Sequence, residues 1–286
     1  MSLTSDFILA SGDFASRYVV LVEERACSKQ KPMKVGQVLQ YPADNMIFAF
    51  SFERVGNVGQ FSQNMVSCQI ADLPAGDRTK IPKCYLLPFE RDEVTQMRLG
   101  NKADFFFTST LCGCTVQVDG PRTTPRVAHA NAGQLYGDTY ANSKAASTLK
   151  GADKIHAQAE AMANTAAQAN MQAKLPIPGA GLVGTVTKAD YLAHYTKHNL
   201  KAAKHVFKTE ADYRVSKLNP TTSMGGLKPA IGAFVFGRKN ARDEWTFYYQ
   251  SNIDVNGTLK RTRGGSGKKE IQYEGVVLGP VRQFYP

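Results

Sequence analysis

A cysteine and a histidine fifteen residues apart are the side chains of this sequence with the clearest chemical use. Cys114 follows a glycine between two apolar segments, and His129 lies in the next short apolar segment. Two adjacent strands would bring these side chains together. A cysteine attacks as the thiolate, and a neighbouring imidazole that takes the thiol proton makes it reactive. The spacing therefore indicates a nucleophilic cysteine with a histidine base.

The glycine before this cysteine, Gly113, is the second feature of the segment. Glycine lets the backbone turn tightly and approach a substrate closely. The amide N–H groups of such a turn can stabilise the oxyanion of a tetrahedral intermediate. From residue chemistry alone one alternative stays open, in which Cys114 and His129 are two core residues on paired strands.

Thr108, the segment Leu111-Cys112-Gly113-Cys114 and His129 together resemble the Leu-Ser-Gly-Cys motif and the downstream histidine of the bacterial glutamine deamidases. This set includes the cytotoxic necrotizing factor catalytic domain, Burkholderia lethal factor and the chemotaxis receptor deamidase. The resemblance is confined to this part of the chain. It implies a β-sandwich core with helices around it and the hydrolysis of a protein glutamine side chain to glutamate.

By position, the resemblance makes Cys114 the nucleophile, His129 the base and Thr108 the residue that orients the histidine. Cys112 departs from the motif, because it stands where the motif has serine. It places a second thiol two residues from the first. Since Gly113 favours a break in the extended chain between them, we expect the two thiols to differ in exposure.

The segments around these residues predict a β-rich first half. Phe48, Phe50 and Phe52 alternate, which places three rings on one face of a strand, and we expect that face to be core. Runs of aromatic and β-branched residues between turn signals predict the following strands: Tyr18–Glu23, Met46–Phe52, Met65–Ile70, Lys83–Phe89, Ala103–Thr108 and Thr115–Val118.

The composition changes after Tyr140. Residues 143–174 are rich in Ala, Gln, Lys and Asn, which favours a helix. Its narrow apolar stripe is expected to lie against the sheet or a neighbouring helix, with a flexible helical arm as the alternative. Two prolines end this helix, and the glycines at positions 179, 181 and 184 predict a mobile joint.

The last third predicts one more helix and then strands. The helix should run from Lys188 to about Phe207, with Thr187 as N-cap and Asp190 near the positive end of its dipole. Two hairpins should follow, the first from Ala233–Phe236 with Trp245–Tyr249 and the second from Val255–Arg263 with Lys269–Val277. The alternating rings at positions 245, 247 and 249 are expected in the core, with the lip of an active-site groove as the alternative.

Strands, then helices, then strands predict the α+β class, with a mixed or antiparallel β-sandwich core and flanking helices. We expect residues 1–140 to form the β-rich part that carries the Cys/His site. Residues 141–180 would form the Ala-rich helix and the Pro/Gly joint. Residues 181–286, with the basic helix and the hairpins, would complete the same domain.

The formal net charge of +11 is unevenly placed. Residues 181–286 hold 17 Lys and Arg against 8 Asp and Glu, an excess of +9, whereas residues 1–180 hold 18 against 16. Such a surface suits an acidic protein, nucleic acid or an anionic membrane, and charge alone does not separate these. The candidate docking residues, beside the tip of the second hairpin, are Lys260, Arg261, Lys268 and Lys269.

No metal or cofactor site is predicted. The five cysteines lack the paired spacing of a zinc ribbon and do not form a disulfide scaffold. His194 and His198 have a spacing that can hold a metal, but a third ligand is not evident near them and a solvated basic helix face explains them. The glycine-rich segment 263–269 departs from the phosphate-loop pattern and is expected at a hairpin tip.

The leading hypothesis is a cysteine hydrolase that deamidates a glutamine of a target protein, as a bacterial toxin or effector. A transglutaminase-like outcome is chemically adjacent, since an amine could replace water. The chain shows no membrane-spanning stretch and no Sec signal at residues 1–6, so we expect secretion by another route and action in the target-cell cytoplasm. A cognate chaperone or immunity protein is a further candidate partner. The rival hypothesis is a non-enzymatic basic module that binds nucleic acid, a less favoured partner, or an acidic protein.

Overall fold

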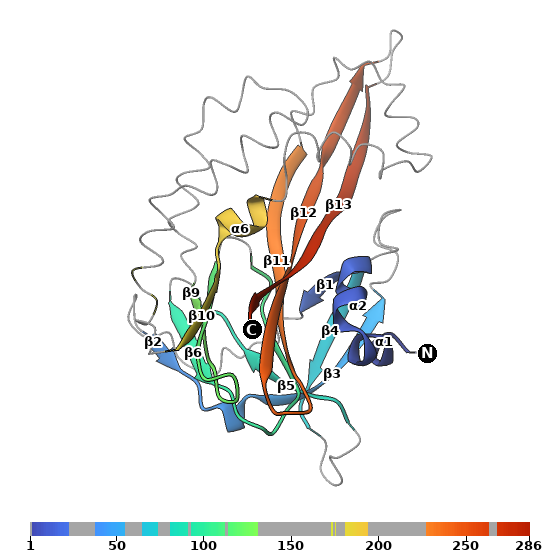
Figure 1. Ribbon diagram of the computed structural model, residues 1–286. Helices are drawn as coiled ribbons and strands as arrows, with labels where there is room; N and C mark the ends of the chain where they lie inside the picture. Colours follow the sequence, from blue (N-terminus) through green and yellow to red (C-terminus); the bar gives the residue numbers. More distant parts are fainter. Residues whose placement is uncertain are drawn as a thin grey trace.

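The computed structural model describes residues 2–22, 38–54, 65–73, 81–90, 93–111, 114–130, 173, 175, 181–193, 227–262 and 268–286. Within these residues the strands form two mixed sheets, and two short helices cover the outer face of the larger sheet (Figure 1). This confirms the predicted α+β class with a β-sandwich core and flanking helices.

The larger sheet combines strands from both ends of the chain. β1 runs parallel to β4 and β5 runs parallel to β7, and the other neighbours are antiparallel. In spatial order its eight strands are β1 (Val19–Val22), β4 (Met65–Ala71), β3 (Ile47–Arg54), β5 (Lys83–Leu87), β7 (Phe105–Thr108), β11 (Leu227–Lys239), β12 (Trp245–Thr262) and β13 (Lys268–Tyr285).

The smaller sheet carries the predicted cysteine and histidine segments. β2 runs parallel to β6, and the other neighbours are antiparallel. Its five strands, in spatial order, are β10 (Leu182–Val186), β8 (Thr115–Gly120), β9 (Arg126–Ala130), β6 (Val94–Arg98) and β2 (Val38–Gln40). The 3-10 turn η1 (Ala43–Asn45) leads from β2 into β3 of the larger sheet.

The six strands predicted from the first half are all present, as are both hairpins of the last third. β11 pairs with β12 over the whole length of β11, from Leu227 opposite Gly257 to Lys239 opposite Trp245, and β12 and β13 pair as far as Thr262 with Lys268. In Figure 1 this second hairpin extends away from the rest of the sheets. The strands β2, β6 and β10 were not predicted.

The core lies in two layers. Between the sheets, Trp245, Phe247 and Tyr249 are buried with residues of both sheets, which confirms them as core. On the outer face of the larger sheet, helices α1 (Leu3–Leu9) and α2 (Ser11–Arg17) pack against an aromatic cluster. Its centre is Phe7, whose ring centroid lies 4.7 Å from that of Phe52.

Helix α6 (Lys188–Leu192) begins as predicted, because the Asp190 carboxylate accepts hydrogen bonds from the backbone N–H and the hydroxyl of Thr187, each at 2.7 Å. The prediction of a mobile joint at Gly184 is wrong. Gly184 lies inside β10, paired with Val118 of β8. Nearly all of the predicted Ala-rich helix and the histidines at 194, 198 and 205 lie outside the described residues.

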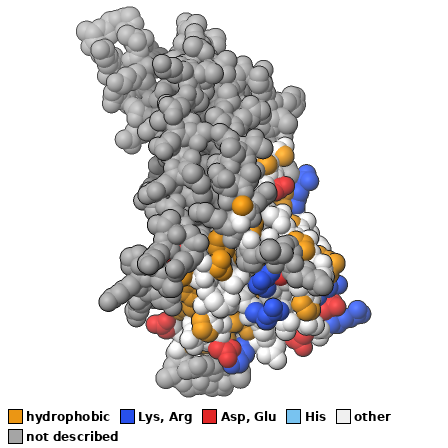
Figure 2. Space-filling view, turned by 90° about the vertical axis from the view of Figure 1, so that its left-hand side faces the viewer, with side chains coloured by type: hydrophobic (Ala, Val, Ile, Leu, Met, Phe, Trp, Pro, Cys, Tyr) orange, Lys and Arg blue, Asp and Glu red, His pale blue; other side chains and the backbone are white. Residues whose placement is uncertain are grey.

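Charges of both signs are mixed on the described surface. On the face that Figure 2 shows, Lys and Arg side chains are interspersed with Asp and Glu. Lys239, one of the basic residues of the last third, lies within 3.3 Å of carboxylate oxygens of both Asp104 and Asp243. Helices long and apolar enough to cross a membrane are absent from the described residues.

Candidate active site

The register of the smaller sheet places Cys114 and His129 on one face. His129 of β9 lies directly opposite Val116 of β8, and residues directly opposite each other point to the same side. Val116 points into the layer between the sheets, and Cys114, two residues earlier, packs in that same layer. Cys114 directly precedes β8, so it lies two residues before Val116, the residue opposite His129.

A hydrogen bond joins His129 to the larger sheet. Oγ1 of Thr108, the last residue of β7, lies 2.7 Å from Nδ1 of His129. The same hydroxyl donates to the backbone carbonyl of Leu87, at 2.8 Å. A hydroxyl has one proton to donate, so its oxygen must accept from Nδ1–H. This network assigns the tautomer with the proton on Nδ1 and leaves Nε2 with a lone pair.

Nε2 of His129 is the atom that can act as a base. It is buried and has no hydrogen-bond partner within the part of the chain that the structure describes. Burial lowers the pKa of His129 to about 3, because an imidazolium loses its hydration there. The imidazole is thus neutral at neutral pH. A resting thiolate–imidazolium pair is disfavoured, and the ring can take a proton while a reaction proceeds.

The end of β5 supports the surroundings of His129. Thr95, its register partner on β6, donates a hydrogen bond to the carbonyl of Pro88 at 2.6 Å. Leu87 and Pro88 therefore accept from two threonines, Thr108 on one sheet and Thr95 on the other. The Thr95–Pro88 and Thr108–His129 contacts join the two sheets where His129 lies.

The backbone of Cys114 is held by a residue that the sequence did not single out. The hydroxyl of Tyr191, on α6, donates to the Cys114 carbonyl at 3.2 Å. Cys114 is a thiol and is 6% exposed. Cys112 and Gly113 lie outside the described residues, so the expected oxyanion turn and the difference between the two thiols stay predictions.

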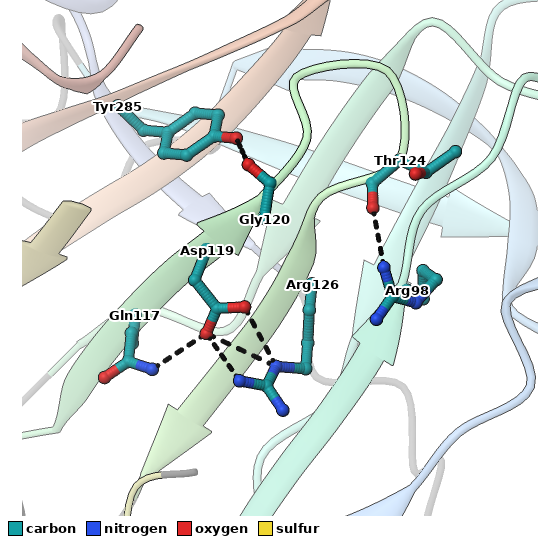
Figure 3. Close-up of polar contacts among 7 residues, drawn as sticks. All are labelled: Arg98, Gln117, Asp119, Gly120, Thr124, Arg126 and Tyr285. Carbon is teal, nitrogen blue, oxygen red and sulfur yellow. Dashed lines mark hydrogen bonds and ion pairs between the residues drawn. The ribbon is translucent and has the colours of Figure 1, made fainter. Parts of the chain in front are cut away.

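The far end of the β8–β9 hairpin is anchored by charge and by a second tyrosine (Figure 3). Asp119 lies opposite Arg126 and accepts from its guanidinium, at 2.7 Å for Nη2, and from the Gln117 amide at 3.0 Å. The hydroxyl of Tyr285, on β13, donates to the Gly120 carbonyl at 2.7 Å. These contacts lie at the turn end of the hairpin, whereas Cys114 and His129 lie towards its other end.

The predicted docking residues belong to the second hairpin and not to the strands around Cys114 and His129. Lys260 and Arg261 belong to β12 and Lys268 and Lys269 to β13, at the tip of the second hairpin. A group of three or more His, Cys, Asp and Glu residues that could hold a metal is not found among the described residues. Thr95 and Tyr191 were missed because their contributions are contacts with residues distant in the sequence.

No protein-family model matches the chain, and no curated protein matches it. Among solved structures, the C-terminal domain of CNFy from Yersinia pseudotuberculosis aligns at 9% identity over 75% of this chain and 70% of that chain, with a TM-score of 0.18. This TM-score is too low to support a conclusion about fold or function.

Proposed function

We propose that this protein is a cysteine hydrolase that converts a glutamine of a target protein to glutamate. The supporting observation is the chain of hydrogen bonds from His129 Nδ1 to Thr108 and on to the Leu87 carbonyl. It leaves Nε2 as a proton acceptor on the face of the smaller sheet that also carries Cys114. A neutral histidine next to a thiol, oriented by a third group, is the arrangement that activates a cysteine.

In this mechanism Sγ of Cys114 attacks the carbonyl carbon of the glutamine side chain while its proton passes to Nε2 of His129. The carbonyl oxygen becomes an oxyanion, which the backbone amides near Gly113 would stabilise. The C–N bond then breaks, Nε2 returns the proton to the nitrogen, and ammonia leaves. Water attacks the thioester as Nε2 takes its proton, the C–S bond breaks, and the thiol is regenerated with glutamate as product. An amine in place of water would give a transglutaminase product.

We propose further that the enzyme is a bacterial toxin or effector that acts on a protein in the cytoplasm of a target cell. A bacterial effector of this kind can require a chaperone or immunity protein in the producing cell. The rival function, a basic module without catalysis, predicts that neither Cys114 nor His129 matters for what the protein does.

The test combines ammonia release with mass spectrometry. The wild type and Cys114→Ser would each be incubated with a library of glutamine-containing peptides and with a eukaryotic cell lysate. Glutamine-to-glutamate conversion by the wild type alone supports the proposal. Equal conversion by both proteins would show that Cys114 is not the nucleophile. The absence of conversion together with uniformly slow iodoacetamide labelling of all five cysteines would favour the binding module.

A further inference from the structure

Strand β8 is held at both ends by a tyrosine hydroxyl from another element. At its start, the Tyr191 hydroxyl of α6 donates to the carbonyl of Cys114, at 3.2 Å. At its end, the Tyr285 hydroxyl of β13 donates to the carbonyl of Gly120, at 2.7 Å (Figure 3). The two contacts are chemically alike, but only one involves the residue with the candidate nucleophile.

Cys114 lies just beyond the paired part of its strand. The pairing of β8 with β9 begins at Thr115 opposite Ala130, and its pairing with β10 begins at Val116 opposite Val186. The hydrogen bond from Tyr191 restrains the Cys114 carbonyl at this point, and with it the peptide plane that sets the direction of the Cα–Cβ bond.

Tyr191 is itself firmly placed. Its side chain is fully buried between the sheets, in the same core layer as Cys114. The turn that carries it follows directly on β10 and is fixed by the hydrogen bonds between Thr187 and Asp190. Because β10 runs antiparallel to β8, from Leu182 opposite Gly120 to Val186 opposite Val116, α6 follows at the start of β8, where Tyr191 contacts Cys114.

We propose that Tyr191 is a positioning residue, which aligns Sγ of Cys114 with Nε2 of His129 by holding the Cys114 carbonyl. This inference rests on the proposed function, in which Cys114 is the nucleophile. A shift of about 1 Å in a reacting group can cost on the order of 100-fold in rate. The hydroxyl acts through the backbone of Cys114, so its loss should lower kcat and leave KM nearly unchanged.

The test compares Tyr191→Phe with Tyr285→Phe, its matched control. Each variant loses one hydroxyl and leaves one carbonyl at an end of β8 without that donor. We expect Tyr191→Phe to lower kcat about tenfold, with KM within about twofold, on the peptide that the wild type deamidates fastest. Tyr285→Phe should keep kcat within about twofold, with a similar fall in Tm. Equal kcat values for the two variants, or a loss confined to KM, would overturn the proposal.

A second readout does not need a substrate. The rate of Cys114 alkylation by iodoacetamide would be followed against pH by peptide mass spectrometry, in a Cys112→Ser background. We expect the Tyr191→Phe variant to differ from the wild type in how the rate of Cys114 alkylation depends on pH. The Tyr285→Phe variant should show the same pH dependence as the wild type. A selective change without deamidation by the wild type would reject the proposed function but keep the positioning role of Tyr191. Identical profiles for all three proteins would reject the positioning role.

Discussion

The side-chain oxygen of Thr108, on the larger sheet, lies 2.7 Å from Nδ1 of His129, on the smaller sheet. Each residue is fully or almost fully buried. Since the threonine proton goes to the Leu87 carbonyl, the bond has a direction, from the histidine to the threonine. The candidate base is therefore oriented and given its tautomer by the contact between the two sheets.

Thr108→Val should remove this control without changing the shape of the side chain. The valine leaves Nδ1–H and the Leu87 carbonyl without their partner, at a cost of about 1–3 kcal/mol in stability. We expect kcat to fall about 10- to 100-fold because the imidazole can then rotate or take the other tautomer. Thr108→Ser keeps the hydroxyl and should retain most activity. The measurement is kcat for deamidation by the two variants. Equal kcat values for Thr108→Val and Thr108→Ser would reject the role of the Thr108 hydroxyl.

Stability should fall as the pH drops, in part because of His129. Its pKa is about 3 in the folded protein and about 6.5 when unfolded, so between these values only the unfolded chain takes up the proton. His129 therefore lowers the free energy of unfolding by up to about 1.4 kcal/mol per pH unit below pH 6.5.

His129→Gln lacks this titration and should show a shallower fall in stability between pH 6.5 and pH 4. Denaturant unfolding at several pH values gives the free energy of unfolding of both proteins. The contributions of the other titrating groups cancel in the difference between the two. A wild type with the same pH dependence as His129→Gln would show that His129 is not buried in its neutral form.

The two thiols of the motif should respond differently to serine. Cys114→Ser is nearly isosteric but lacks an easily ionised thiol, so we expect turnover to be lost with the fold intact. Cys112→Ser restores the residue of the resembling motif and should retain most activity. His129→Ala should lose as much turnover as Cys114→Ser, and the variant with both changes should lose little more. This is the result expected when two groups act as one unit. Activity in Cys114→Ser but not in Cys112→Ser would move the nucleophile by two residues.

The basic hairpin tip should govern association with an acidic partner. Lys260, Arg261, Lys268 and Lys269, if all changed to Glu, would reverse the charge there. We expect weaker binding to polyglutamate at low salt and a smaller salt dependence, because exposed charges are screened over about 8 Å at physiological ionic strength. Binding would be measured across a salt titration, with duplex DNA as a second probe. Unchanged polyglutamate binding would reject the role, and a loss for DNA alone would indicate nucleic acid instead.

The strands were predictable because their signal is local. Alternating apolar residues such as Phe48, Phe50 and Phe52 mark a pleated, half-buried segment whatever it pairs with. Helices α1 and α2 were missed because they are short and contain Ser, Gly and Asp, which favour helices weakly. Burial of Phe7 and Phe14 against the larger sheet stabilises them, and that is a tertiary effect.

The residues of the candidate site also divide into those with a signal in the sequence and those placed only by tertiary contacts. Thr108, Cys114 and His129 could be named from their types, their spacing and the resemblance to a motif. The Leu87 carbonyl and the Tyr191 hydroxyl could not, because a backbone acceptor has no sequence signal and Tyr191 lies 77 positions from Cys114. Pairing between strands, of β5 with β7 and of β8 with β10, brings these groups together.

Gly184→Ala tests whether β10 needs a glycine to pack beside β13. A Cβ added at this position would overlap the backbone carbonyl of Phe284 and come within 3.1 Å of its ring. A backbone atom cannot move aside cheaply, so we expect a loss of about 1–3 kcal/mol in the free energy of unfolding.

Because β10 leads directly into α6, the displacement from Gly184→Ala should also reach Tyr191 and slow the alkylation of Cys114. The control is Gly12→Ala on α2, where an added Cβ meets no atom within 4 Å. Alanine favours a helix over glycine by up to about 1 kcal/mol, so this variant should be as stable as the wild type or more so. Denaturant unfolding compares the two. A Gly184→Ala variant as stable as the wild type would show that β10 and β13 are not packed this closely, and the route from β10 through α6 to Cys114 would lose its support.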